Sequence, residues 1–398
     1  MKLFKSLLVA PATLGLLAPT SANATEVNLN EIANYSADVE VIEFANSFVA
    51  DDLNKDSLLA GGEGLVDDHS HDGSFSETTT ASFGLDFYLG ALSDEVSGET
   101  TQDDALTFGY SLGIGLNTSF TGEDSLDITI DAGNVTEGVA EFDGNTGGDE
   151  LTVDGISYTF PLGGATVLVG DSTDGSALFT TACAYGGPSN MLDDCGNVNA
   201  GITGGEATIG ASYDFGNGFT MATGFQTSST ASGMFTEESK DAYALNAAYI
   251  ADSYGVSLTY ANTENTALTN EDTYTAFNAY YTPDMENLPS LSVGYEVGEI
   301  GGAVAAEDES TSFFVGLTWD EVGPGSAGIA LGHSSTIENV DEAYQYEAYY
   351  SYPVNDGMTI TPLVFVKENT GKQVGNGTGG KNELDDTVGV MVKTSFSF

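Results

Sequence analysis

The sequence predicts an all-β protein: a transmembrane antiparallel β-barrel of about 16 strands with a short, mostly irregular N-terminal extension. Three observations carry this prediction. Short segments of alternating apolar and polar residues recur from Phe75 onward, aromatic residues stand near the ends of many segments, and the alternation continues to Phe398, the last residue. Period-two alternation marks a strand with one apolar and one polar face. Because a long apolar edge strand invites pairing with other chains, closure into a barrel is expected.

The N-terminal segment has the three parts of a secretory signal peptide. Lys2 and Lys5 supply the positive start, residues 7–17 are mostly apolar, and the small residues Ala22 and Ala24 fit the cleavage site. The apolar run is too short and too interrupted for a membrane-spanning helix. We therefore expect a signal peptide at 1–24, an acidic periplasmic extension with one weak helix at 25–74, and a barrel at 75–398.

The charge of the chain excludes one large class of partner. Sixty Asp and Glu residues face only eight Lys and no Arg, for a formal net charge of −52. Nucleic acid is not an expected partner, because binding it requires Lys and Arg to neutralise phosphates. Disorder is also not expected for the main body, since apolar residues make up 41% of the chain and lie on periodic segments.

The predicted strands follow one another with turns between them. Two short turn sequences, Asp154-Gly155 and Gly216-Asn217-Gly218, are typical of hairpins. Longer acidic loops are expected elsewhere, for example at 94–104, 298–310 and 368–386. In chain order the predicted strands span 82–89, 105–118, 126–131, 151–153, 156–160, 165–171, 207–215, 219–225, 242–250, 254–260, 272–282, 291–298, 311–319, 326–333, 344–352, 357–367 and 386–398.

Short turns at one rim and long loops at the other are typical of outer-membrane barrels, and a barrel of about 16 to 18 strands retains an aqueous channel. A soluble all-β sandwich is the alternative, since alternation does not say whether the apolar face meets lipid or a core. The signal peptide, the polar faces without Arg, and the aromatic strand ends favour the membrane barrel. The aromatic residues are Tyr88, Tyr213, Phe215, Tyr260, Tyr280, Tyr281, Trp319, Tyr350 and Tyr352.

The two cysteines, Cys183 and Cys195, lie in a stretch rich in Gly, Pro, Asn and Asp. In an exported protein they are expected to form one disulfide that pins a loop; two unpaired thiols are the alternative. A long loop that folds into a wide membrane barrel can narrow the channel, where its carboxylates select ions. The segment 171–200 is the candidate here, with Asp171, Asp174, Asp193 and Asp194 facing the permeant solute. A rigid extracellular loop that caps the barrel or meets a neighbouring subunit is the alternative.

Three passages resemble cyanobacterial outer-membrane porins, which are grouped with the carbohydrate-selective porins. They are residues 75–80, the loop from Cys183 to Cys195 with its Gly-Gly-Pro-Ser-Asn run, and residues 352–358. The resemblance implies a homotrimer in the cell outer membrane that passes small solutes by diffusion. Many members carry an S-layer-homology domain after the signal peptide. The segment 25–74 contains no Trp, no Arg and no heptad run, so we do not expect that domain here.

Catalytic residues, cofactors and metals are not expected. The histidine His333 has no matched acid or nucleophile, and no nucleophile, zinc or phosphate-loop motif occurs. His69 and His71, with flanking Asp residues, could hold a divalent metal, but a solvated spacer is the preferred interpretation.

We therefore expect an outer-membrane porin for ions, sugars and small nutrients. Its partners are membrane lipid, the barrel-assembly machinery and the solutes themselves. The pore should prefer cations or neutral solutes, because a chain without Arg cannot build the basic rings of anion-specific pores. A secreted acidic β-rich structural or adhesive protein that binds Ca²⁺ is the alternative, although no nine-residue repeat supports it. A barrel enzyme is a third hypothesis, for which a polar catalytic cluster is lacking.

Residues 388–398 are expected to close the barrel by pairing with the strand near Phe83. The terminal aromatics Phe396 and Phe398 resemble the signal by which the barrel-assembly machinery selects its clients. Deletion of Phe398 should lower the fraction of assembled barrel, measured as heat-modifiable migration on gels, more than it lowers the conductance of assembled channels. Normal assembly of the deletion variant would reduce the terminal alternation to a lipid-facing pattern.

Overall fold

The computed structural model describes residues 79–93, 105–136, 139, 141–142, 144–227, 234–236, 239–264, 270–285, 287–303, 307–368, 374–375, 381–382 and 386–397. The predicted signal peptide with Ala22 and Ala24, the extension with its helix, and Phe398 lie outside the described residues. No helix in the described ranges is long and apolar enough to cross a membrane.

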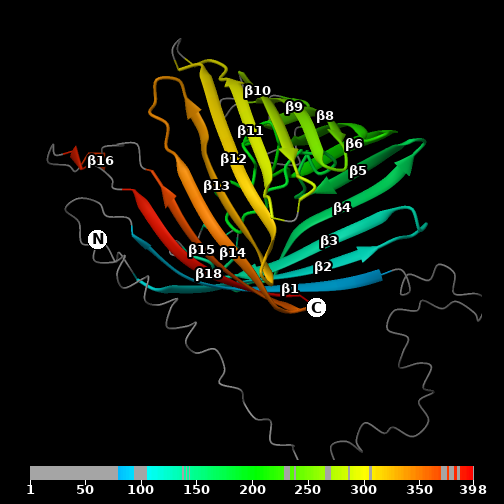
Figure 1. Ribbon diagram of the computed structural model, residues 1–398. Helices are drawn as coiled ribbons and strands as arrows, with labels where there is room; N and C mark the ends of the chain where they lie inside the picture. The colour runs from blue at the N-terminus through cyan, green and yellow to red at the C-terminus, as the bar shows by residue number, and fades with distance from the viewer. Residues whose placement is uncertain are drawn as a thin grey trace, which may run out of the picture. The chain divides into compact units, whose positions relative to one another are not determined.

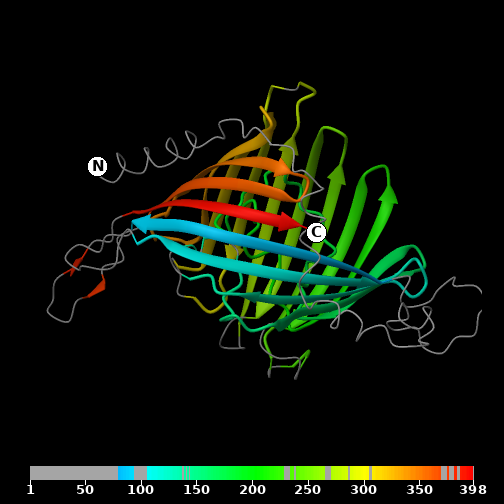
Figure 2. The ribbon, with the colours of Figure 1, turned by 90° about the horizontal axis from the view of Figure 1, so that it is seen from below.

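Sixteen strands close into one antiparallel barrel, which confirms the predicted fold class and strand number. Figures 1 and 2 show these strands as a ring. The two-residue strands β16 (Val374–Gly375) and β17 (Lys381–Asn382) form a separate small sheet. The barrel strands are β1 Thr79–Ser93, β2 Thr107–Thr118, β3 Ser125–Gly133, β4 Thr152–Leu162, β5 Ala165–Asp171, β6 Ala207–Gly216, β7 Phe219–Thr227, β8 Asp241–Ile250, β9 Tyr254–Glu264, β10 Glu271–Tyr281, β11 Ser290–Glu299, β12 Glu309–Val322, β13 Gly325–Ile337, β14 Gln345–Asn355, β15 Met358–Lys367 and β18 Thr387–Ser397.

Closure depends on β18, the last strand. It pairs with β15 on one side and with β1 on the other. Its register against β1 is continuous, from Ser397 opposite Gly84 to Val388 opposite Ser93. This confirms the pairing expected from the alternating C-terminal sequence, and it leaves neither terminal strand of the barrel with an open edge.

Most connections alternate between shorter turns at one rim and longer loops at the other; the connection between β9 and β10, which is shorter than that between β10 and β11, is the exception. The hairpin predicted at Gly216-Asn217-Gly218 is confirmed between β6 and β7. The φ angles of these residues are 78°, 53° and 86°, in the left-handed region that Gly and Asn adopt most readily. The turn residues of the local sequence are therefore sufficient to predict this hairpin.

The hairpin predicted at Asp154-Gly155 is wrong. Both residues lie within β4, which pairs with β3 from Thr152 to Thr159 and with β5 from Ile156 onward. Neither residue has the positive φ that a two-residue type I′ turn requires. On β3, Thr129 lies opposite Gly155 whereas Ile130 lies opposite Val153, so Asp154 is the extra residue of a β-bulge. The Asp-Gly pair marks a local irregularity within the strand instead of its end.

The alternation separates an apolar outer face from a polar inner face. Large outward side chains are well exposed, for example Phe108 at 60% and Leu258 at 52%. Small polar side chains on the other face, such as Asn246 and Ser257, are buried within the barrel. The outer surface is thus a continuous apolar wall, as in a barrel that meets hydrocarbon.

Two of the predicted rim aromatics, Tyr88 and Tyr280, lie on the inward-facing series; Tyr280 is opposite the buried Ser292 of β11. Tyr88 is 1% exposed and points into the barrel, because its register partners Gly109 and Lys393 belong to the inward-facing series. Its ring packs against Phe142, with centroids 5.2 Å apart. By contrast, Tyr213, Phe215, Tyr260, Tyr281 and Tyr352 are exposed, in agreement with the predicted outward aromatics.

Candidate functional site

Two connections fold into the barrel and line its interior. The first is residues 172–206, between β5 and β6, here called the long loop. The second is residues 134–151, between β3 and β4, described except for positions 137, 138, 140 and 143 and here called the second loop. Figure 1 shows green segments of the chain inside the ring of strands. The path of the long loop therefore supports an inward loop over the alternative of an external cap.

The outgoing branch of the long loop is bonded to the inner wall at every second residue. Each of three backbone N–H groups donates to a small polar side chain on a different strand. These bonds join Thr180 to Asn246 of β8 at 3.0 Å, Ala182 to Ser257 of β9 at 2.9 Å, and Ala184 to Ser292 of β11 at 2.8 Å. The wall side chains thus satisfy backbone donors that would otherwise be buried without partners.

The returning branch is held by one buried carboxylate, that of Glu296 on β11. Glu296 is 1% exposed. It accepts hydrogen bonds from the backbone N–H of Asn199 at 2.9 Å, the backbone N–H of Ala200 at 2.8 Å and the side-chain amide of Asn199 at 2.8 Å. Three donors converging on one carboxylate make a strong attachment, because charge-assisted hydrogen bonds exceed neutral ones in strength.

The tip of the long loop is held by a second wall carboxylate, Glu347 on β14. Glu347 accepts hydrogen bonds from the Tyr185 hydroxyl and from the Ser189 hydroxyl. Burial, together with the adjacent Glu347 carboxylate, raises the pKa of Tyr185. The Tyr185 hydroxyl therefore remains a proton donor, which suits its contact with this acceptor.

The disulfide between Cys183 and Cys195 joins the two branches, which confirms the predicted pairing; the Cα atoms are 6.5 Å apart. Both cysteines lie against the inner wall, where the carbonyl of Cys195 accepts a hydrogen bond from Asn278 at 2.8 Å. The disulfide links the outgoing branch, which small polar side chains anchor, to the returning branch, which Glu296 anchors. The tip, which contacts Glu347 through Tyr185 and Ser189, lies between the two cysteines in the chain.

Glycines on the inner wall make room for the long loop. A Cβ atom on Gly294 of β11 would lie 1.7 Å from the carbonyl oxygen of Cys195, and one on Gly224 of β7 would lie 1.8 Å from that of Gly175. Only glycine permits such close approach of two backbones. The sequence signal was present, because glycine recurs on the polar face of these strands, but the partner segment could not be identified from it.

The second loop closes against the tip of the long loop. The backbone N–H of Asn190 donates to the carbonyl of Glu141 at 3.0 Å, and the Glu141 carboxylate lies 3.5 Å from the ammonium of Lys367. Apolar side chains from both loops and from the wall pack together at this place inside the barrel. The cluster comprises Tyr88, Val135, Val139, Phe142, Tyr185, Leu192, Cys195, Phe314, Ala330, Tyr349, Leu363, Phe365 and Met391.

The four predicted constriction residues do not lie together. Asp171 is the last residue of β5. It lies opposite Ile156 and Ala207, in the series of residues that faces outward. Asp174 lies at the root of the long loop, where it accepts a hydrogen bond from the N–H of Gly204 at 2.7 Å. Asp193 and Asp194 lie at the tip. Sequence reasoning missed Glu296 and Glu347, whose only signal is a carboxylate on the inner face of a strand.

The inward lysines of the described barrel strands are paired with acids. Lys393 on β18 lies 3.4 Å from Asp86 on β1, and Lys367 on β15 contacts Glu141 as above. Each pair neutralises a positive charge that would otherwise face the lumen. The carboxylates without a lysine beside them therefore set the sign of the interior field.

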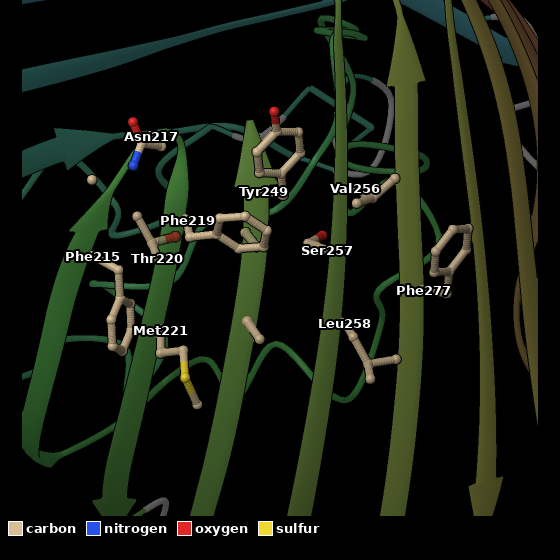
Figure 3. Close-up of a pocket in the computed structure, with 13 residues that line it drawn as sticks. Phe215, Asn217, Phe219, Thr220, Met221, Tyr249, Val256, Ser257, Leu258 and Phe277 are labelled. Atoms are coloured by element: carbon tan, nitrogen blue, oxygen red, sulfur yellow. The ribbon is translucent and has the colours of Figure 1, made fainter. Parts of the chain in front are cut away.

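An apolar groove of about 690 Å³ lies on the outer face of β6 to β10 (Figure 3). It forms where Ala247 stands between the larger Met221 and Leu258 in adjacent strands, so that a gap opens in the outer wall. Phe219 and Phe277 also line it. The groove belongs to the apolar exterior.

Within the described residues, no group of three or more His, Cys, Asp or Glu side chains is arranged to hold a metal ion. His333 is 5% exposed, and its Nδ1 lies 3.0 Å from the Ser334 carbonyl oxygen. His69 and His71 lie outside the described residues.

The barrel resembles solved porin structures at low sequence identity. The anion-selective porin from Comamonas acidovorans aligns with a TM-score of 0.58 and 15% identity, covering 81% of this chain and 99% of that chain. OprB of Pseudomonas putida aligns with a TM-score of 0.55 and 12% identity, covering 81% and 95%. OmpT, an outer membrane protein of Vibrio cholerae solved in a trimer form, aligns with a TM-score of 0.53 and 10% identity, covering 81% and 100%. The sequence matches no protein-family profile and no curated protein. At these identities the likeness shows the shared fold alone.

Replacement of Glu296 by Gln should loosen the long loop. The amide has one accepting oxygen, so at least one of the three donors that converge on Glu296 loses its partner. We expect the folded barrel to lose about 1–3 kcal/mol, the usual cost of a buried unpaired polar group. The measurement is the urea midpoint of unfolding in lipid vesicles. Glu299→Gln, at the exposed end of the same strand, is the matched control, and equal midpoints for both variants would contradict the assigned role.

The tip residue Asp194 should make the interior sensitive to pH. Loss of solvation inside the barrel, together with the charges of Asp193 and Glu296, raises the pKa of Asp194 to about 7, although the side chain keeps an exposed surface. Since the folded pKa lies above the ordinary value of 3.8, the stability that the neutral form contributes is lost as pH rises through about 7.

Over the same range the lumen gains a negative charge. The ratio of cation to anion permeability, measured in planar bilayers, should therefore rise between about pH 6 and pH 8. Asp194→Asn should remove this rise. A pH dependence that persists in the variant would assign the titration to another group.

Proposed function

We propose that the protein is an outer-membrane porin that passes small hydrophilic solutes by passive diffusion, without catalysis. The observation that carries the proposal is the closed barrel of 16 strands with an apolar exterior and a polar interior narrowed by inward loops. An interior of this width is too large for wall side chains alone to fill. The solutes in view are inorganic ions, sugars and small nutrients.

The exterior supports the membrane location. Large apolar side chains are exposed on strand after strand, as Phe108 on β2, Leu258 on β9 and Val364 on β15 illustrate. A secreted, soluble structural or adhesive protein would leave this wall in water, where contiguous apolar surface of such extent drives association. Lipid is therefore the proposed solvent of the outer face.

The interior supports a preference for cations or neutral solutes. The chain contains no Arg, and the inward residues Lys367 and Lys393 are paired with acids. The Comamonas protein, which has a similar fold, is an anion-selective porin, and that selectivity is a property of its own side chains. Asp174, Asp193 and Asp194 are the loop carboxylates proposed to act on permeant ions, whereas Asp171 lies on the outer-face series.

Export by the signal peptide, insertion by the barrel-assembly machinery and assembly as a homotrimer complete the proposal. The signal-peptide pattern of residues 1–24 motivates the first, and the terminal aromatics Phe396 and Phe398 motivate the second. The resemblance to cyanobacterial porins motivates the third, and the trimer form of the Vibrio cholerae protein is consistent with it. Carbohydrate transport stands on that resemblance alone.

Purified protein in a planar bilayer should produce stepwise, ohmic conductance. In a KCl gradient its reversal potential should indicate that potassium passes more readily than chloride, because carboxylates outnumber bases in the interior. Absence of conductance from correctly folded barrel would contradict the porin assignment. Channels that prefer chloride would contradict the cation preference while leaving the porin assignment intact.

A further inference from the structure

A polar cavity of about 710 Å³ lies between the inner face of β3 and β4 and the root of the long loop. Its wall side includes Thr129, Gly155 and Ser157, which share the inward register of these strands. Its loop side is formed at the two ends of the long loop, near Asp174 and Glu206. The complete lining is Thr129, Val153, Asp154, Gly155, Ser157, Ser172, Thr173, Asp174, Ala177, Gly204, Gly205 and Glu206.

Much of the described inner wall is covered. The long loop is bonded to β7, β8, β9 and β11 through Gln226, Asn246, Ser257 and Glu296. Its tip and the second loop pack on β14, β15 and β18 through Glu347, Lys367 and the apolar cluster. Solute passing these walls would have to displace bonded or packed groups. The inner face of β3 and β4 carries no such layer at the cavity.

The cavity is acidic on both sides. Asp154, Asp174 and Glu206 all line it and are exposed, and no lysine is among the lining residues. Asp131, on the same wall, interacts with the carboxyl of Asp154.

The same inner face continues towards the opposite rim with a further acid. Asp127 is on the inward register of β3, and its carboxylate accepts a hydrogen bond from Asn117 at 2.6 Å. The wall opposite the long loop thus carries carboxylates in the place where a basic ladder would favour anions.

We infer that small cations cross the barrel on one side only, through this cavity, and that Asp154 and Glu206 together with Asp174 determine the charge selectivity. The inference rests on the proposed porin function. It goes further by assigning the selectivity to carboxylates at the cavity instead of to those at the loop tip. The decisive carboxylates stand on the β4 bulge and at the loop root, and the tip pair Asp193 and Asp194 contributes less. The bulge has a role in this arrangement, because it adds Asp154 to the wall at the level of the loop root.

Neutralisation of the cavity tests the inference. The double variant Asp154→Asn, Glu206→Gln should lower the potassium to chloride permeability ratio by about fivefold or more. A single charge about 4 Å from an ion in water changes its local concentration by roughly that factor. The matched control, Asp193→Asn with Asp194→Asn at high pH, removes the same number of acids from the tip and should change the ratio less. Measurements use reversal potentials at low salt, where screening is weak.

The possible outcomes separate the two levels of the proposal. A larger effect of the tip variant than of the cavity variant, or equal effects, would overturn the placement of the filter while the porin function stands. Unchanged selectivity in both variants would also overturn it. Absence of conductance from the correctly folded, unmodified protein would overturn the porin function itself.

A second measurement does not depend on charge variants. The native cysteines are joined to each other, so an introduced cysteine is the free thiol for labelling. A bulky thiol reagent on Ser157→Cys, in the cavity, should lower single-channel conductance by about twofold or more, since the proposed path is confined there. The same reagent on Ser257→Cys, which is 2% exposed behind the long loop, should leave conductance unchanged. Block at Ser257 without block at Ser157 would overturn the inferred path.

Discussion

Pairing between β1 and β18 is the constraint on which the rest of the structure depends. It joins the first and last described strands of the barrel, so that each strand has two neighbours and backbone donors and acceptors along the wall find partners. Closure also separates an inside from an outside. Once that distinction exists, the period-two alternation assigns every residue to lipid or to lumen, and the polar residues become available to hold loops and to meet solute.

The loops inside the barrel follow from the chemistry of the inner wall. Small residues such as Gly224 and Gly294 let the backbone of the long loop approach closely, and Ser, Asn and Glu side chains receive its N–H groups. The two carboxylates Glu296 and Glu347 hold the returning branch and the tip. Because the two loops cover parts of β7 to β11 and of β14, β15 and β18, the interior is asymmetric: an apolar cluster packs at the loop tip, and an acidic cavity lies at the inner face of β3 and β4.

The sequence predicted much of the architecture because the relevant patterns are local. Alternation identified strands, Gly216-Asn217-Gly218 identified a hairpin through its φ requirements, and two cysteines in an exported chain identified a disulfide. The failures are also instructive. Asp154-Gly155 has turn composition but forms a bulge, because pairing with β3 continues on either side of Asp154, at Val153 and at Gly155. Tyr88 is an aromatic near a strand end, but its register points it inward to Phe142.

By itself the sequence determined the barrel, its closing strand, its charge and a loop pinned by one disulfide, with an inward and an external position of that loop as alternatives. The tertiary structure decided which wall the loop covers and therefore where the acidic cavity remains. The physical reason is the distance along the chain between partners. Asn199 and Glu296 are 97 residues apart, and Tyr185 and Glu347 are 162 apart, so no periodic pattern relates them. Only closure of the sheet brings each wall carboxylate to the loop segment whose donors it accepts.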